Sequence, residues 1–188
     1  MEIINPVIKF ADIFHNLSDE IISFQELDVK DTDEIHSYTS DVEVSRYIGW
    51  KLMLHREETY EHIETMLKRE AAGTHLYASV VLKETGTVIG TVMLFDFHFD
   101  TSIAEIGYVF HKDYWGKGYG TRSVALICEF AEHKLKLKKL TASVVDENIS
   151  SARVLMKNGF SLEERVKGEY QIDGRVCDKL VLCKNINP

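Results

Sequence analysis

The chain has 188 residues, of which 45% are hydrophobic and 28% are charged. This composition is typical of one soluble globular domain, and the length is sufficient for a hydrophobic core. The net charge of −8 argues against non-specific binding to nucleic acid, and no apolar run approaches the roughly 18 residues that a membrane-spanning helix needs.

Residues 1–20 show no clear hydrophobic period, so we treat them as an N-terminal extension of unassigned role and expect the domain over residues 21–188. Asp31 can cap the first predicted helix. The last helix predicted in the first half of the chain, over residues 55–72, is amphipathic, and Gly73 fits its C-terminal end. In order, this half is predicted to hold a strand over 21–27, a helix over 31–38, a helical turn over 41–47 and a helix over 55–72.

Strands and helices alternate only in the second half of the chain, which predicts a mixed sheet. Residues 84–87 are expected to form a hairpin turn, and Asp173-Gly174 are expected to form another. In order, this half is predicted to hold strands over 76–83, 88–97 and 103–111, a helix over 120–134, a strand over 140–145, a helix over 150–157, and strands over 160–167 and 170–183.

Residues 106–122 combine an apolar strand, a glycine-rich loop and the start of a helix. Gly116, Gly118 and Gly120 lack the Cβ atoms that would keep a bulky anion away from the backbone N–H groups. The helix that follows directs its positive end to the same place. The pattern is typical of a loop that holds phosphates, and a plain glycine-rich connection between strand and helix is the alternative.

Two known phosphate-binding loops fit this stretch poorly. A Walker loop needs Gly-Lys-Ser/Thr, but Lys117 is followed by Gly118. A dinucleotide-binding loop needs a glycine at its sixth position and an acidic residue about 20 positions later. Counted from Gly116, the sixth position is Thr121, and residues 135–139 are basic.

A second motif follows the loop: Asn148, then Ser151 three positions later, then a short apolar helix that ends in Gly-Phe. The two motifs together resemble the GNAT acetyltransferases, whose acyl-CoA loop reads Q/R-x-x-G-x-G/A. Trp115 stands here in place of the usual Gln or Arg. The resemblance covers residues 31–184 and is closest to the branch that holds the ribosomal-protein N-terminal acetyltransferases.

The resemblance implies a GNAT fold of the α/β (α+β) class, in which a central, mixed but mostly antiparallel, splayed sheet of six to seven strands is flanked by about four helices. Acetyl-CoA would be the co-substrate in the splayed cleft, opened by a bulge at Gly107. Asn148 would contact the pantetheine, or it could instead be a helix N-cap. The expected cofactor-binding residues are Val109 and Phe110 through their backbone groups, then Gly116, Lys117, Gly118, Gly120, Thr121 and Asn148. Lys112 and Arg122 either contact phosphates or are solvated charges.

The resemblance also implies direct attack of a primary amine on the thioester, in a ternary complex. Glu105 is the candidate general base, and a salt-bridged strand glutamate is the alternative. Ser151 is the candidate general acid for the departing thiolate, and an ordinary first-turn serine is the alternative. Tyr108 or Tyr119 could supply that proton instead.

The favoured acceptor is the N-terminal amine of a protein or peptide. The alternatives are a small-molecule amine, such as an amino acid, a polyamine or an antibiotic, and a non-catalytic module that binds acyl-CoA. Tyr47, Trp50 and Tyr170 are candidate walls of the acceptor site. The chain is expected to act as a monomer or homodimer, with no nucleic acid or membrane partner.

The cysteines Cys128, Cys177 and Cys183 are odd in number and form no C-x-x-C motif, which is typical of reduced thiols in a cytoplasmic protein. The N-terminus lacks the basic region and apolar core of a signal peptide, which also favours the cytoplasm. The eight histidines show no ligand-like spacing, so no metal site is expected.

Overall fold

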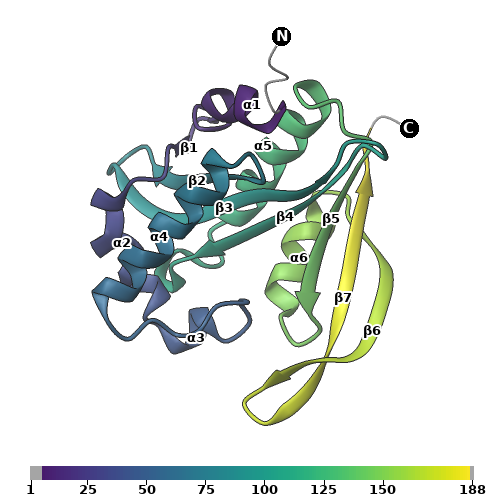
Figure 1. Ribbon diagram of the computed structural model, residues 1–188. Coiled ribbons are helices and arrows are strands. Elements are labelled where there is room, and N and C mark those ends of the chain that lie inside the picture. Colours follow the sequence, from purple (N-terminus) through teal and green to yellow (C-terminus); the bar gives the residue numbers. More distant parts are fainter. Residues whose placement is uncertain (1–5, 187–188) are drawn as a thin grey trace.

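The computed structural model describes residues 6–186, which form one seven-stranded sheet with helices packed on both faces (Figure 1). The strands are β1 (Ile22–Gln25), β2 (His75–Leu82), β3 (Thr87–His98), β4 (Ile103–Phe110), β5 (Lys139–Val145), β6 (Ser161–Ile172) and β7 (Arg175–Asn185). The α-helices are α1 (Pro6–Phe14), α2 (Thr32–Thr39), α3 (Val42–Ser45), α4 (Arg56–Ala71), α5 (Tyr119–His133) and α6 (Ile149–Lys157).

The strand order is β1-β2-β3-β4-β5-β7-β6, and each neighbouring pair is antiparallel except β4 and β5. These two run parallel because α5 carries the chain back between them. A mixed, mostly antiparallel sheet of seven strands confirms the predicted architecture. Six α-helices are described, where about four and a helical turn over 41–47 were expected; α3 lies at that turn, and α1 is the additional helix.

Alternating side chains divide the core into two layers. Even-numbered residues of β2, such as Leu76 and Val80, pack in the larger cluster with α1, α5 and α6, whereas odd-numbered Tyr77 and Val81 pack with α2, α3 and α4. In Figure 1, α2 and α4 lie in front of the sheet and α5 lies behind it. None of the described helices is long and apolar enough to cross a membrane.

Helix α1 was not predicted, although its apolar residues follow a helical period. Val7 and Phe14 are fully buried, and the Phe14 ring packs on Phe24 of β1 and on Phe130 of α5. The helix has nine residues, too few for its period to stand out, and apart from β1 the core that holds it is formed by residues much later in the chain. Residues 6–14 therefore contribute to the main core.

The C-terminal hairpin differs from the prediction in where one strand ends. Strand β6 continues to Ile172, so Tyr170 belongs to β6 and not to the following strand. Pairing with β7 is irregular between Val166 and Tyr170, which explains the apparent break in the sequence pattern. The predicted turn at Asp173-Gly174 is confirmed, and both residues have positive φ, of 51° and 75°.

Strands β4 and β5 separate soon after they begin. They pair only where Ile103–Glu105 lies beside Lys139–Thr141, and the rest of β4 pairs with β3 alone among the described strands. The expected bulge at Gly107 is wrong, because Gly107 pairs regularly with Met93 and the irregularity lies in β3, between Phe95 and His98. The result is a sheet that opens between β4 and β5.

Candidate active site

The glycine loop connects β4 to α5 with two residues in the left-handed backbone region. Gly116 has φ +73° and Gly118 has φ +89°, which residues with a Cβ rarely adopt. A Cβ at either position would meet no heavy atom within 4 Å, so the space beside both is open. Gly118 is the N-cap of α5, no described side chain caps the helix there, and the first turn carries no acidic residue. The first N–H groups of α5 are therefore free to receive an anion.

A cavity of about 610 Å³ lies at this loop, between the second half of β4 and the first two turns of α6. This volume is within the usual range for small-molecule sites. Eight of the ten predicted site residues line it, namely Val109, Phe110, Gly116, Gly118, Gly120, Thr121, Asn148 and Ser151. Lys117 and Glu105 do not line it.

The register of β4 determines which backbone groups face the open side. The His111 N–H donates to the Ile89 carbonyl at 2.9 Å, and β3 and β4 pair without a shift from Phe110 back to Glu105. Backbone groups of successive residues alternate between the two edges of an antiparallel strand. The N–H groups of Tyr108 and Phe110 therefore face the splayed side, whereas that of Val109 faces β3.

Trp115 joins the loop to the end of β4. Its indole Nε1–H donates to the Phe110 carbonyl at 2.8 Å, while about half of its side chain is exposed and lines the cavity. In the loop pattern this position usually carries Gln or Arg. Here the tryptophan fixes the start of the loop to the strand edge and adds an apolar surface to the cavity.

Asn148 and Ser151 begin α6 beside β4. Asn148 Oδ1 accepts a hydrogen bond from the Ser151 N–H at 3.2 Å, so Asn148 is the N-cap of α6 and also lines the cavity. The Tyr108 hydroxyl lies 2.9 Å from Ser151 Oγ and 3.0 Å from the Ser151 carbonyl oxygen, to which it can donate. Burial raises the pKa of Tyr108 to about 12, although the hydrogen bond with Ser151 opposes this. Tyr108 therefore stays protonated at neutral pH.

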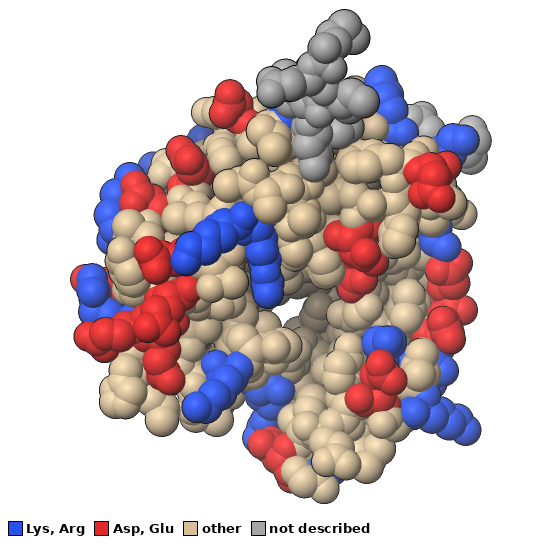
Figure 2. Space-filling model, viewed as in Figure 1, with Lys and Arg blue, Asp and Glu red and all other residues tan. Residues whose placement is uncertain are grey.

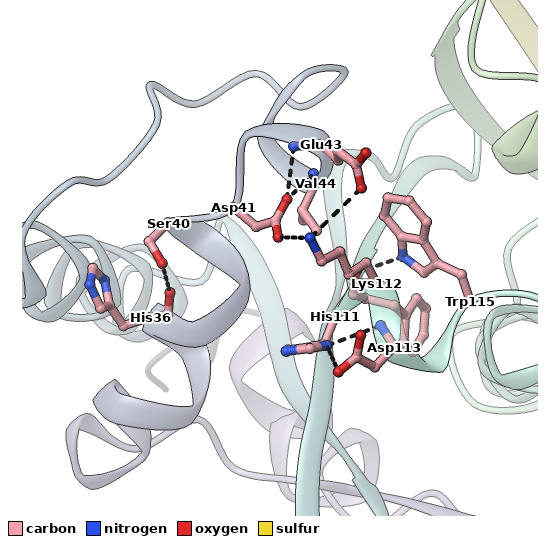
Figure 3. Close-up of polar contacts among 10 residues, drawn as sticks. His36, Ser40, Asp41, Glu43, Val44, His111, Lys112, Asp113 and Trp115 are labelled. Atoms are coloured by element: carbon pink, nitrogen blue, oxygen red, sulfur yellow. Dashed lines mark hydrogen bonds and ion pairs between the residues drawn. The ribbon is translucent and has the colours of Figure 1, made fainter.

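Cations near the loop form contacts that the sequence did not predict. Lys112 Nζ lies 2.6 Å from Asp41 and 3.8 Å from Glu43, as Figure 3 shows. Arg122 NH1 lies 2.8 Å from Asp19 and 2.6 Å from Glu20. These two cations thus have carboxylate partners. The Lys117 ammonium lies 5.3 Å from the centre of the Tyr114 ring.

Two cations that the sequence reasoning missed line the cavity from α6. Arg153 and Lys157 stand four residues apart, which places them on one face of the helix. The same spacing is visible in the sequence once residues 150–157 are taken as a helix. They are the basic side chains of α6 that border the cavity, so they can compensate a bound polyanion.

Glu105 lies at the point where β4 and β5 separate. It is the last residue of β4 that pairs with β5, and its Oε1 accepts a hydrogen bond from the Ser143 N–H at 3.2 Å. Ser143 lines a second cavity, of about 560 Å³, which also contains the predicted acceptor walls Tyr47, Trp50 and Tyr170. Glu105 is therefore next to the second cavity.

The two cavities share one wall, formed by residues 46–48. This segment follows α3 and faces the β6–β7 side of the molecule. Figure 2 shows the molecule hollowed between these two parts, with an opening between them. Residues 6–186 contain no group of three or more His, Cys, Asp or Glu side chains arranged to hold a metal ion.

A family model described as an acetyltransferase (GNAT) domain matches residues 22–161. The uncharacterized N-acetyltransferase p20 of Bacillus licheniformis is 26% identical over 159 residues, which cover 85% of this chain and 89% of the relative.

Solved structures of similar fold include two from Vibrio species. The ribosomal-protein-S5-alanine acetyltransferase from Vibrio fischeri has a TM-score of 0.78 at 21% identity, covering 90% of this chain and 96% of that one. The spermidine N-acetyltransferase from Vibrio cholerae, in complex with CoA and spermine, has a TM-score of 0.78 at 19% identity, covering 89% and 96%. Because the family model matches most of its length, the chain belongs to the GNAT acetyltransferase family.

Proposed function

We propose that the protein transfers the acetyl group of acetyl-CoA to the N-terminal α-amine of a protein or peptide. The observation that supports the use of acetyl-CoA most strongly is the glycine loop. Gly116 and Gly118 have left-handed backbone at the uncapped start of α5, and the loop faces a cavity of about 610 Å³ beside the unpaired edge of β4.

The coenzyme would be held largely by backbone groups. The N–H groups of the loop and of the first turn of α5 would receive the pyrophosphate, with the Thr121 hydroxyl as a further donor. Arg153 and Lys157 would supply positive charge. The pantetheine would pair with the N–H groups of Tyr108 and Phe110 as an added strand does.

The acetyl transfer needs two proton movements and one preplaced donor. The amine nitrogen attacks the thioester carbonyl carbon, the C–N bond forms and the C–S bond breaks. Glu105 accepts a proton from the amine, directly or through water. A backbone N–H of β4 stabilises the oxyanion, and Ser151 Oγ donates its proton to the departing thiolate. The Tyr108 hydroxyl, 2.9 Å from Ser151 Oγ, can pass its own proton to the serine oxygen. Tyr108 then regains a proton from water, and Glu105 releases its proton to water, which closes the cycle.

A small-molecule amine is the second candidate acceptor. It is favoured by the similarity to the Vibrio cholerae spermidine N-acetyltransferase, whereas the Vibrio fischeri neighbour favours a protein acceptor. A module that binds acyl-CoA without turnover is the remaining alternative. Glu105 and Ser151, which carry the two protons in the proposed reaction, argue against that module.

The substitution Glu105→Gln tests the proposal, because an amide oxygen can still accept from the Ser143 N–H but cannot take up a proton. We expect turnover to fall by about 10²- to 10⁴-fold, with unchanged affinity for acetyl-CoA in calorimetric titration. The exposed Glu129→Gln on α5 is the matched control. Full turnover in Glu105→Gln would remove Glu105 as the base.

A further inference from the structure

The second cavity is lined by one pair of opposite charges, which form an ion pair with each other. Among the described residues that line it, the charged ones are Arg46 and Asp173, and Arg46 Nε lies 2.9 Å from Asp173 Oδ2. Arg46 directly follows α3, and Asp173 lies in the turn of the β6–β7 hairpin. The ion pair therefore joins the two sides of the cavity.

The remaining walls are aromatic, aliphatic or neutral. Trp50 and Tyr170 supply large rings, and Leu52 and Ile172 supply aliphatic surface. The Trp50 indole is held in place, since its Nε1–H donates to Ser45 Oγ at 3.3 Å and its ring packs edge-on against His62 at 5.3 Å. Such walls bind apolar groups by removing their surface from water.

The charge balance of the cavity bears directly on which amine can bind. An acceptor with a second ammonium group needs a free carboxylate, but Asp173 is already paired with Arg46. An acceptor with its own carboxylate needs a free cation, but Arg46 is paired with Asp173. The extra charge of either acceptor would have to compete with this ion pair for a partner, so it would lose part of its hydration in the cavity and gain little in return. Glu105, which contacts Ser143 of the cavity wall, remains for the reacting amine.

We propose that the second cavity selects an acceptor amine whose neighbouring group is uncharged and apolar, as at a peptide N-terminus with an aromatic or aliphatic first residue. Polyamines and free amino acids are selected against by the Arg46–Asp173 pair. The inference rests on the proposed function, because it takes the second cavity as the acceptor side of the acetyltransferase.

Binding can be measured separately from turnover. The protein would be saturated with CoA and titrated calorimetrically with tripeptide amides of sequence Phe-Ala-Ala, Lys-Ala-Ala and Asp-Ala-Ala, with spermidine and with free phenylalanine. We expect Phe-Ala-Ala amide to bind at least about tenfold more tightly than the other four. Equal or tighter binding of spermidine, of free phenylalanine or of either charged peptide, or no binding of any probe, would overturn the inference.

Two substitutions that remove one charge each make the test sharper. In Arg46→Gln the Asp173 carboxylate loses its partner, so binding of spermidine and Lys-Ala-Ala amide should strengthen. In Asp173→Asn the Arg46 guanidinium loses its partner, so binding of Asp-Ala-Ala amide and free phenylalanine should strengthen. The double variant should restore the original order. An order of preference that stays the same in both single variants would contradict the role of the pair.

These variants should fold normally, because the pair is exposed, with 43% and 55% of the two side chains accessible. Val176→Ala, on β7 of the same hairpin and outside the lining residues, is the control for general effects on the hairpin. The affinity for CoA should be measured in each variant, because Arg46 also borders the first cavity.

The two proposals fail in different ways. If Phe-Ala-Ala amide binds as expected but no thiol is released from acetyl-CoA, the selectivity stands and the proposed activity fails. If thiol is released fastest with spermidine, acetyl transfer itself stands, but the selectivity and the proposed peptide acceptor both fail.

Discussion

Gly118 and Gly86 have similar left-handed backbones, with φ of +89° and +70°, but only Gly118 borders the first cavity. The substitution Gly118→Val strains the loop and places methyl groups in the open space beside it. We expect it to weaken acetyl-CoA binding at least tenfold, because hydrogen bonds to charged groups contribute about 1.5–3 kcal/mol each. Gly86→Val should strain its turn similarly and leave the affinity unchanged. Unchanged calorimetric affinity in Gly118→Val would contradict the phosphate-binding role of the loop.

Tyr108 and Ser151 make a second prediction at this scale. Ser151→Ala should lower kcat by about 10²-fold or more, because the thiolate loses its proton donor. Tyr108→Phe should lower kcat less. Burial raises the pKa of Tyr108 to about 12, so its hydroxyl does not titrate between pH 6 and 9. Tyr108→Phe should therefore lower kcat by the same factor at every pH in this range. A new pH dependence in Tyr108→Phe would argue against this assignment.

The residues of the site were predictable where the chemistry is local. The glycines and Asn148 with Ser151 lie within short motifs, and the structure brings both motifs to one cavity. The partners of Lys112 and Arg122 were not predictable, because Asp41 and Asp19 are distant in sequence. Which N–H groups of β4 face the splayed side, those of Tyr108 and Phe110 or that of Val109, depends on the pairing register with β3. The sequence of one strand does not reveal that register.

At the scale of elements, strands β3 and β4 pack so closely at two glycines, Gly90 and Gly107, that a Cβ atom at either would clash with a neighbouring residue. A Cβ on Gly90 would lie 2.3 Å from the Val109 carbonyl oxygen, whereas a Cβ on Gly107 would lie 2.4 Å from the Met93 Cε. A backbone atom cannot move aside without disturbing the sheet, but the end of a methionine can rotate.

Gly90→Ala should therefore destabilise the protein by about 1–3 kcal/mol, and Gly107→Ala should destabilise it less. Denaturant unfolding with an unchanged m-value measures both. Equal loss in the two variants would mean that the clash at Met93 is as rigid as the one at the Val109 carbonyl, and the reverse order would mean that it is more rigid. Either result would contradict the prediction.

Element boundaries were predictable where caps and turns mark them, as at Gly73 after α4 and Asp173-Gly174 in the last hairpin. Helix α1 and the continuous course of β6 were not. Both depend on partners elsewhere in the chain, α1 on the core at Phe24 and Phe130 and β6 on its pairing with β7.

At the scale of the whole molecule, a nearly buried ion pair connects the N-terminal part to the layer of α4. His15 Nε2 lies 3.1 Å from Glu70 Oε1, with 9% and 11% of the two side chains exposed. Burial lowers the pKa of His15, but the hydrogen bond and charge of Glu70 and the charge of Glu26 outweigh it, so the pKa is raised above the usual 6.5. The charged form of His15 is therefore favoured by folding.

The sign of the resulting pH dependence follows from the raised pKa. The stabilisation is fully present below about pH 6.5 and is lost as the pH rises through the folded pKa of His15. Compared with wild type, His15→Gln should lose stability at pH 6 and approach the wild-type value at higher pH. Thermal or denaturant unfolding across pH 6–9 measures this, with the exposed His133→Gln as control. A difference that grows with pH would contradict the assignment.

The central claim, acetyl transfer to an amine, is tested most directly by the release of free CoA thiol from acetyl-CoA with Phe-Ala-Ala amide as acceptor, with mass spectrometry of the peptide. The account predicts thiol release that depends on the acceptor and a peptide acetylated on its α-nitrogen. A wild-type protein that binds acetyl-CoA but releases no thiol with any peptide, amino acid, polyamine or aminoglycoside would contradict it.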